Sequence, residues 1–281
     1  HMLRKIQIAI IMLVSLFSLP LFARMVEQEE NFTIRQNSLS ISVEIDGGEL
    51  IVLQSNDKNK CNVLMSYPRE KCTVDVRYNE KRGQLEITID NDEWNFNSED
   101  EKAPQVILEL PHGPEISLSA YLKAGETKFE LGGLKIVDFE LRNWAGESSV
   151  NFAEPNRTIM STFDVNVKVG EVDLLNLGNA LFEDADINSG IGELRVDFNG
   201  EGLEQTKAHI DLDIGETTVI LPSNIATKIK VSKFLFLSDV RYPNWFEKRG
   251  SYYFSENYED SEKKLSLNIS SGIGELSIKV E

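Results

Sequence analysis

Seven carboxylates are the first candidates for chemistry in this chain, because each directly follows a glycine and they recur at a nearly constant interval. The central five are Glu126, Glu147, Glu171, Glu193 and Glu216, at steps of 21, 24, 22 and 23 residues, and Glu49 and Glu275 are outlying copies. Stacked on neighbouring turns of a repeat, such side chains would offer the oxygen ligands that Ca²⁺ prefers. Each repeat supplies only one, however, without accessory carbonyl or Asp ligands. We therefore interpret them as a solvated acidic corner and predict no metal and no cofactor.

A second set of polar residues stands six positions before each glycine. Its members are Ser119, Glu140, Asp164, Asp186, His209 and Asn268. If consecutive repeats stack, Asp164 and Asp186 become neighbours, and paired carboxylates can act as acid and base in glycan cleavage. Outward Asp and Asn are also what any solvated strand face carries. A catalytic pair is therefore the alternative, and no catalytic residue is the leading interpretation.

The rest of the sequence offers no pairing of a nucleophile with a base. Apart from His1, only His112 and His209 are histidines, and neither a Gly-x-Ser-x-Gly elbow nor a P-loop is present. The net charge of −17 disfavours nucleic-acid binding, which depends largely on clustered Lys and Arg. We therefore predict a protein that is not an enzyme and does not bind nucleic acid.

Aromatic residues are concentrated in residues 239–262, which also interrupt the glycine repeat. This density suits stacking on a glycan or contact with a protein partner. It also suits a cap over the open end of a repeat fold, which is the simpler interpretation. Both hold if one face packs inward and the other stays exposed. The candidates for a partner-binding face are Tyr242, Trp245, Phe246, Tyr252 and Tyr253.

The only two cysteines are Cys61 and Cys72. In an exported protein an even pair of cysteines is typical of a disulfide. The segment between them contains Pro68 and is interpreted as the turn of a hairpin. We therefore predict a Cys61–Cys72 disulfide, with two buried thiols as the alternative.

The glycine repeat also predicts the elements that would position these side chains. Apolar residues flank each glycine at even spacing, for example Ile187 and Ile191 before Gly192, and Val196 and Phe198 after it. Period-two alternation indicates strands, and glycine permits a sharp corner between them. Two strands per repeat describe one coil of a β-solenoid, whose stacked coils share one core. All of these apolar rows, including the residue directly before the glycine, are predicted to face inward.

The chain divides into three parts on this interpretation. Residues 2–23 have the basic start and apolar run of a secretory signal, and an uncleaved membrane anchor is the alternative. His1 is interpreted as an added residue. Residues 24–112 form an irregular β-region after a polar lead-in over residues 24–37, and residues 113–281 form regular coils. Strands are predicted at residues 39–45, 49–54, 61–66, 73–78, 84–89 and 105–110, and a final coil at 264–280.

The arrangement resembles a known bacterial family. A leading β-region ends in Val106-Ile107-Leu108-Glu109-Leu110-Pro111, Gly-Glu coils follow, and the chain closes on Ser271-Gly272-Ile273-Gly274-Glu275. This is similar to the toast-rack adhesin-like proteins, which are related to the C-terminal domain of the envelope stress regulator LiaF. The resemblance implies a single-stranded β-helix, exported or membrane-tethered, without an established enzymatic activity.

The expected function is that of a non-enzymatic, exported β-solenoid in the periplasm or at the cell surface. It would act as an adhesin or an envelope-binding scaffold, with an envelope protein, surface protein or glycan as its partner. Copies could associate through the solenoid ends, and membrane contact is expected only if the N-terminal segment stays uncleaved. The alternatives are a carbohydrate-active enzyme and the sensor domain of an envelope-stress system.

Overall fold

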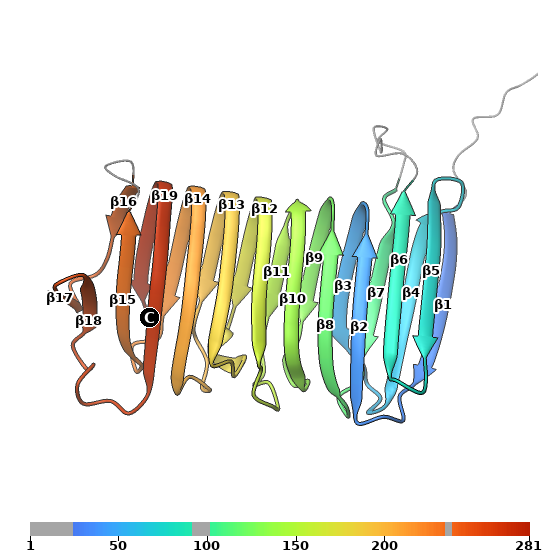
Figure 1. Ribbon diagram of the computed structural model, residues 1–281, viewed down its shortest axis with the longest axis horizontal. Coiled ribbons are helices and arrows are strands. Elements are labelled where there is room, and N and C mark those ends of the chain that lie inside the picture. Colours follow the sequence, from blue (N-terminus) through green and yellow to red (C-terminus); the bar gives the residue numbers. More distant parts are fainter. Residues whose placement is uncertain (1–24, 92–101, 234–237) are drawn as a thin grey trace, which may run out of the picture.

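The computed structural model describes residues 25–91, 102–233 and 238–281, which form an elongated stack of β-strands (Figure 1). The predicted signal segment lies outside the described residues. One short 3-10 helix, η1, spans Leu177–Asn179. The strands are β1 Met25–Thr33, β2 Ser38–Ile45, β3 Gly48–Gln54, β4 Lys60–Pro68, β5 Cys72–Asn79, β6 Gln84–Asn91, β7 Gln105–Leu110, β8 Glu115–Leu122, β9 Gly125–Glu130, β10 Ile136–Ala145, β11 Ser148–Asn151, β12 Thr162–Leu175, β13 Asp184–Asp197, β14 Gln205–Leu221, β15 Ala226–Lys233, β16 Ser238–Arg241, β17 Phe246–Arg249, β18 Tyr252–Ser255 and β19 Lys264–Val280.

Each coil contributes to two sheets that meet at the glycine corner. The front sheet in Figure 1 runs β5-β6-β2-β8-β10-β12-β13-β14-β19-β15-β18-β17. The back sheet runs β1-β4-β7-β3-β9-β11-β12-β13-β14-β19-β16. The long strands β12, β13, β14 and β19 bend at their glycines and belong to both sheets. Neighbouring coils pair in parallel, which confirms the all-β solenoid of the toast-rack type.

The core lies between the two sheets and is continuous along the stack. Most of the inward rows follow the predicted alternation, and Ile187 and Val196 are completely buried. Phenylalanine rings from successive coils contact one another inside, with centroid separations of 5.2 Å for Phe129–Phe139, 5.5 Å for Phe139–Phe163 and 5.3 Å for Phe163–Phe182. Because a single coil is only one strand wide in each sheet, it buries its apolar side chains completely only when further coils stack on both sides of it.

One predicted inward row faces solvent instead. The residues directly before the glycines, Val169, Ile191, Ile214 and Ile273, are 43–49% exposed. The alternation changes phase at the corner: Ser189 and Leu194 point inward on either side of Gly192, and they are five residues apart. Both neighbours of the glycine consequently point outward. The prediction failed here because it extended period two across a corner at which the chain changes sheet.

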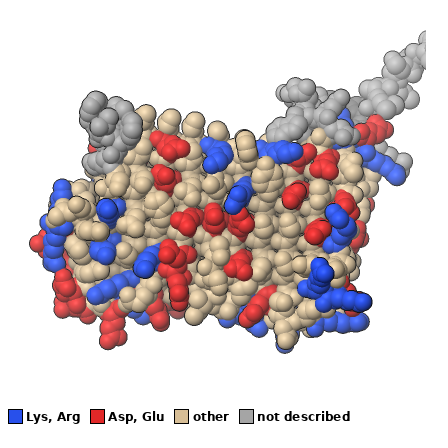
Figure 2. Space-filling model, in the orientation of Figure 1, with Lys and Arg blue, Asp and Glu red and all other residues tan. Residues whose placement is uncertain are grey.

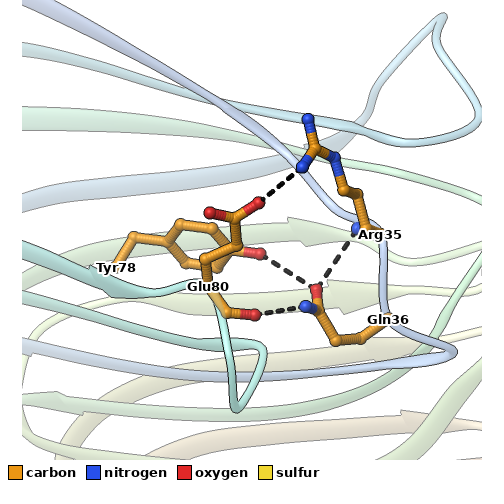
Figure 3. A network of polar contacts seen from close by, with 4 residues as sticks. All are labelled: Arg35, Gln36, Tyr78 and Glu80. Carbon is orange, nitrogen blue, oxygen red and sulfur yellow. Dashed lines mark hydrogen bonds and ion pairs between the residues drawn. The ribbon is translucent and has the colours of Figure 1, made fainter.

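Antiparallel strands close the N-terminal end of the stack. The segment interpreted as a polar lead-in is mostly β1, which pairs with β4 at the end of the back sheet, and the β5–β6 hairpin forms the end of the front sheet. The connection from β1 to β2 is tied to the hairpin turn (Figure 3): Arg35 forms an ion pair with Glu80 at 3.1 Å, and the Tyr78 hydroxyl donates to Gln36 Oε1 at 3.3 Å. The Gln36 amide also donates to the Glu80 carbonyl.

The predicted disulfide is not formed, because the two cysteines lie at opposite ends of β4. Cys61 is the second residue of that strand, and β4 extends about 23 Å from Cys61 to Pro68 at 3.3 Å per residue, with Cys72 just beyond the turn that follows Pro68. A disulfide requires Cα atoms within about 7 Å. The predicted hairpin is also wrong, since β4 pairs with β1 and β7, whereas β5 pairs with β6. Both cysteines are buried thiols.

The C-terminal strand is inserted into the stack and does not end it. β19 pairs with β14 on one side and with β15 and β16 on the other. The segment that precedes it in sequence, β15 to β18, therefore forms the end of the molecule (Figure 1). Residues 264–280 form a regular coil, as predicted, but this coil is not the final one in space. Across the described residues, the structure contains no helix with the length and hydropathy of a membrane span.

Candidate functional site

The glutamates that follow the glycines form one straight row along the back sheet. Direct pairings join Glu49 to Glu126, Glu171 to Glu193, Glu193 to Glu216, and Glu216 to Glu275. Glu147 lies between Glu126 and Glu171, because the residues after it pair with β9 and β12. This acidic row therefore has the seven members predicted from the sequence, which are Glu49, Glu126, Glu147, Glu171, Glu193, Glu216 and Glu275.

Among the described residues, the acidic row has one counter-charge, at its Glu275 end, and a neutral hydrogen-bond donor at its Glu49 end. Arg241 bonds to Glu275 at 2.9 Å, and the Gln105 amide donates to Glu49 at 2.6 Å. Within the residues that the structure describes, the five central glutamates have no ion-pair partner. Adjacent strands are about 4.8 Å apart, and like charges at that distance repel by about 1 kcal/mol in water. The central part of the row is therefore negatively charged without a direct counter-charge.

Two shallow grooves follow the acidic row. One has a volume of about 400 Å³ and is lined by Glu171, Glu193 and Glu216 together with Arg195 and Lys279. The other, about 200 Å³, is lined by Glu126, Glu147 and Lys128 among others. No group of three or more potential metal ligands is present among the described residues. The absence of a metal therefore stays a prediction, and the grooves are best described as open acidic channels.

The second predicted row lies on the front sheet, where Figure 2 shows acidic side chains gathered near the centre of the face. The pairings place Glu140, Asp164, Asp186, His209 and Asn268 on consecutive strands in one register. Asp164 and Asp186 are thus neighbours, as predicted. Partial burial raises the pKa of Asp164; Arg142 lowers it, and the charges of Glu140 and Asp186 add smaller upward contributions. Arg142 also forms an ion pair with Glu140.

The aromatic insertion covers the last coil. β18 pairs with β15, β17 pairs with β18, and Phe246 is buried to 7% exposure. Trp245 and Tyr253 are partly buried against the core, and Trp245 contacts the Phe246 ring at 5.3 Å edge to face. Tyr242 is 44% exposed and its ring contacts the Tyr253 ring at 4.7 Å in a tilted arrangement. The segment therefore has the capping role, and Phe246 is not available to a partner.

The outer surface of this cap combines aromatic rings with lysines. Lys228 and Lys230 of β15 lie over the Tyr252 ring, at 5.3 and 6.0 Å, and Lys264 lies over Tyr258 at 4.8 Å. Residues 222–264 carry eight Lys and Arg against six Asp and Glu, in a chain of net charge −17. Figure 2 shows basic side chains interspersed with acidic ones over this end of the molecule. Sequence reasoning found the aromatic residues and missed the lysines, although charge along the segment was a readable signal.

Comparison with known proteins places the chain in a family. Residues 24–170 match the model of the N-terminal domain of toast_rack, which is more than half of the chain. The chain belongs to the toast-rack family. Residues 162–278 of this toast-rack protein also match the model described as "Cell wall-active antibiotics response LiaF, C-terminal". No curated protein matches the chain.

Several solved structures are similar in fold to this toast-rack protein. A "putative cell adhesion protein" from Clostridium sporogenes is 19% identical, with 91% of this chain and 100% of that chain covered and a TM-score of 0.45. A "putative adhesin" from Bacteroides fragilis is 12% identical, with 90% and 97% covered and a TM-score of 0.36. One from Parabacteroides merdae is 11% identical, with 91% and 96% covered and a TM-score of 0.37.

Proposed function

We propose that this toast-rack protein is a non-enzymatic, exported scaffold that binds an anionic glycan of the cell envelope or cell surface through its C-terminal cap. The family supports an adhesin-like or envelope-associated role. The apolar N-terminal segment supports export, to the periplasm or the cell surface. The observation that carries the glycan assignment is the set of lysines over tyrosine rings on the outer surface of the cap.

These groups suit an acidic sugar chain for two reasons. Tyrosine rings present apolar faces that stack on sugar rings and a hydroxyl that reaches water or ligand. Lysine ammonium groups form charge-assisted hydrogen bonds to carboxylate, sulfate or phosphate groups. Within the described part of the chain, Lys228, Lys230 and Lys264 form no ion pair, so their charge is available to a ligand. The acidic row on the back sheet, in contrast, would repel an anionic glycan.

Binding of a polyanionic and a neutral polysaccharide to the purified protein tests this function. We expect the polyanion to bind and the neutral polymer not to bind, with salt weakening the interaction. Lys230→Gln and Tyr252→Ala should each weaken binding by roughly tenfold, which corresponds to about 1.4 kcal/mol. Lys81→Gln and Tyr121→Ala, at distant sites, are the matched controls. Equal losses in cap and control variants, or no binding to the polyanion, would contradict the proposal.

A carbohydrate-active enzyme is the second candidate, and the pairing of Asp164 with Asp186 favours it. The raised pKa of Asp164 is the property expected of a general acid. Asp186 is exposed and Asp164 half-buried, on an open sheet face. A glycan-degradation screen that finds activity in the parent protein and none in Asp164→Asn/Asp186→Asn would replace the scaffold by this enzyme.

The sensor domain of an envelope-stress system is the third candidate. The match of residues 162–278 to the LiaF C-terminal model favours it. A sensor of this kind would remain attached to the membrane. The sensor and the exported scaffold therefore differ in whether the N-terminal segment is retained or removed. Mass spectrometry of the protein isolated from the envelope decides between them: a retained segment favours the sensor, and a chain that starts near residue 24 favours the exported scaffold.

A further inference from the structure

A row of exposed aliphatic side chains runs along the glycine corner, apart from the cap and from the front-sheet carboxylates. Val169, Ile191, Ile214 and Ile273 occupy one register on β12, β13, β14 and β19. Each is 43–49% exposed. We call these four residues the aliphatic ridge. Figure 2 shows uncharged side chains projecting in a line at the upper edge, over the tops of these strands.

Such a ridge calls for a physical explanation. Single exposed apolar residues are ordinary on protein surfaces, but contiguous exposed apolar residues mark interaction sites. The side chains do not stabilise the core, because the strand alternation is already satisfied by the buried residues on either side. The ridge therefore presents apolar surface to solvent in all four coils, where polar residues would be compatible with the same corner.

The acidic row runs parallel to the ridge at a fixed offset. Each ridge residue stands one position before a glycine, and Glu171, Glu193, Glu216 and Glu275 stand one position after it. The pairing registers keep both rows straight across the same four strands. An apolar line and an acidic line thus lie side by side. The groove lined by Glu171, Glu193 and Glu216 borders the acidic line only, and Arg195 and Lys279 also line it.

We infer that the ridge and the acidic row together bind a cationic amphipathic helix, with its apolar stripe on the ridge and its Lys or Arg flank on the glutamates. The charges decide between this occupant and two others. A second copy of this chain would bring two acidic rows near each other. An anionic lipid surface would be repelled by the same carboxylates. A partner with cations beside an apolar stripe satisfies both rows at once.

Spacing favours a helical partner over an extended one. Ridge residues follow the strand separation of about 4.8 Å, so four of them span about 14 Å. A helix laid along the stack presents one apolar residue per turn of about 5.4 Å, so three turns span about 16 Å. An extended strand repeats a face about every 6.7 Å and would span about 20 Å over three steps. The helix therefore stays within about 2 Å of register across the ridge.

Three synthetic peptides of about 18 residues, or five helical turns, test this site on the full-length protein. The first carries Leu at helical spacing with Lys along one flank. The second has the same composition in scrambled order, and the third has Glu in place of Lys. We expect the first peptide to bind in a fluorescence anisotropy titration, and the other two to bind at least about tenfold more weakly. Equal binding by the scrambled peptide would reduce the interaction to charge alone and overturn the inference.

Variants of the protein locate the site. Ile191→Thr/Ile214→Thr keeps β-branched side chains that suit strands, and Glu193→Gln/Glu216→Gln keeps shape while removing charge. We expect each double variant to bind the first peptide roughly tenfold or more weakly than the parent protein does. Glu115→Gln/Glu256→Gln removes the same charge away from the glycine corner, so it is the control and should leave affinity unchanged. Unchanged affinity in either ridge or glutamate variant overturns the inference.

Two further measurements examine the rejected occupants. Analytical ultracentrifugation of the parent and the Ile191→Thr/Ile214→Thr variant detects a dimer that depends on the ridge. Co-sedimentation with phosphatidylglycerol or phosphatidylcholine vesicles detects a lipid surface. We expect the parent protein to form no dimer through the ridge and to bind no vesicles through it. A dimer or vesicle association that the Thr variant abolishes would assign the ridge to that occupant and overturn the peptide site.

Discussion

The two cysteines occupy different environments, although both are buried. Cys72 donates its thiol proton to Asn91 Oδ1 at 3.0 Å. Cys61 lies in the core, where burial, with a smaller contribution from the Glu109 charge, raises its pKa from 9.0 to about 12. The thiolate is the reactive form of cysteine, so Cys61 is inert at neutral pH.

Alkylation of the native and the denatured protein tests both the absence of the disulfide and the low reactivity of the Cys61 thiol. Without reductant, iodoacetamide should leave Cys61 unmodified in the native protein, because a buried thiol with a raised pKa has almost no thiolate. In denaturant without reductant, both cysteines should be labelled, which intact-mass analysis detects as two added groups. An unlabelled denatured protein would restore the disulfide prediction.

The same pKa has a consequence for stability at high pH. A folded-state pKa raised above the unfolded value favours the protonated native form, so the contribution is complete below about pH 9 and is lost as pH rises toward 12. The loss amounts to about 4 kcal/mol at 1.36 kcal/mol per pH unit. The free energy of unfolding, measured by urea denaturation at a series of pH values from 8 upward, should fall less steeply with pH for Cys61→Ala than for the parent protein. Identical slopes would contradict the raised pKa.

At the scale of the coil, the glycine corner decides the geometry. Gly192 has φ 143°, and a Cβ built on it would lie 1.8 Å from the Gly170 carbonyl oxygen. The same close approach recurs at Gly125, Gly146 and Gly215. Glycine is required here both for the backbone conformation and for the distance between adjacent coils. This accounts for the constancy of the glycine in every repeat.

Substitution at the corner should therefore be far more damaging than at an open glycine. Gly192→Ala forces either strained backbone or separation of two coils, and we expect a loss of more than about 3 kcal/mol in unfolding free energy. Gly250 also has positive φ, at 63°, but nothing lies within 4 Å of its added Cβ. Gly250→Ala should cost only about 1 kcal/mol. Chemical denaturation of both variants checks the difference, and similar losses would show that contact between coils is unimportant.

The sequence predicted the coils well because their signal is local. The strand predicted at residues 105–110 coincides with β7, and the one at 84–89 lies within β6. What failed depends on distant parts of the chain. The pairing of β1 with β4 and the insertion of β19 between β14 and β15 are not encoded in any short pattern. The prediction that the residues before the glycines face inward was wrong, because the alternation of inward and outward residues shifts by one position at the corner.

Across the whole molecule, charge is distributed unevenly along and around the stack. The acidic row occupies the back sheet, and the lysines of the cap stand over aromatic rings at one end. The sequence predicted the glutamates as a row, because the glycine period fixes their register. It did not predict the cap lysines as part of a site, because these acquire their aromatic neighbours only when β15 pairs with β18.

The acidic row makes the stability of the whole stack sensitive to salt. Adjacent glutamates repel by about 1 kcal/mol in water, and screening shortens the range of that repulsion from about 10 Å at 0.1 M salt to 3 Å at 1 M. Sodium chloride should therefore raise the melting temperature of the parent protein. Glu171→Gln/Glu193→Gln removes three adjacent repulsions, so at low salt it should raise the free energy of unfolding by up to about 3 kcal/mol and reduce its salt dependence. Glu115→Gln/Glu256→Gln removes the same charge at isolated sites and should change little.

Calcium distinguishes screening from a specific metal site on the same row. One carboxylate per coil offers a cation few ligands, whereas Ca²⁺ takes six to eight oxygens in well-built sites. Millimolar calcium should therefore shift the melting temperature hardly more than sodium at equal ionic strength. A large shift with calcium alone, lost in Glu171→Gln/Glu193→Gln and retained in Glu115→Gln/Glu256→Gln, would show that the row binds metal. In that case the cationic flank of a partner helix would compete with calcium for the same carboxylates.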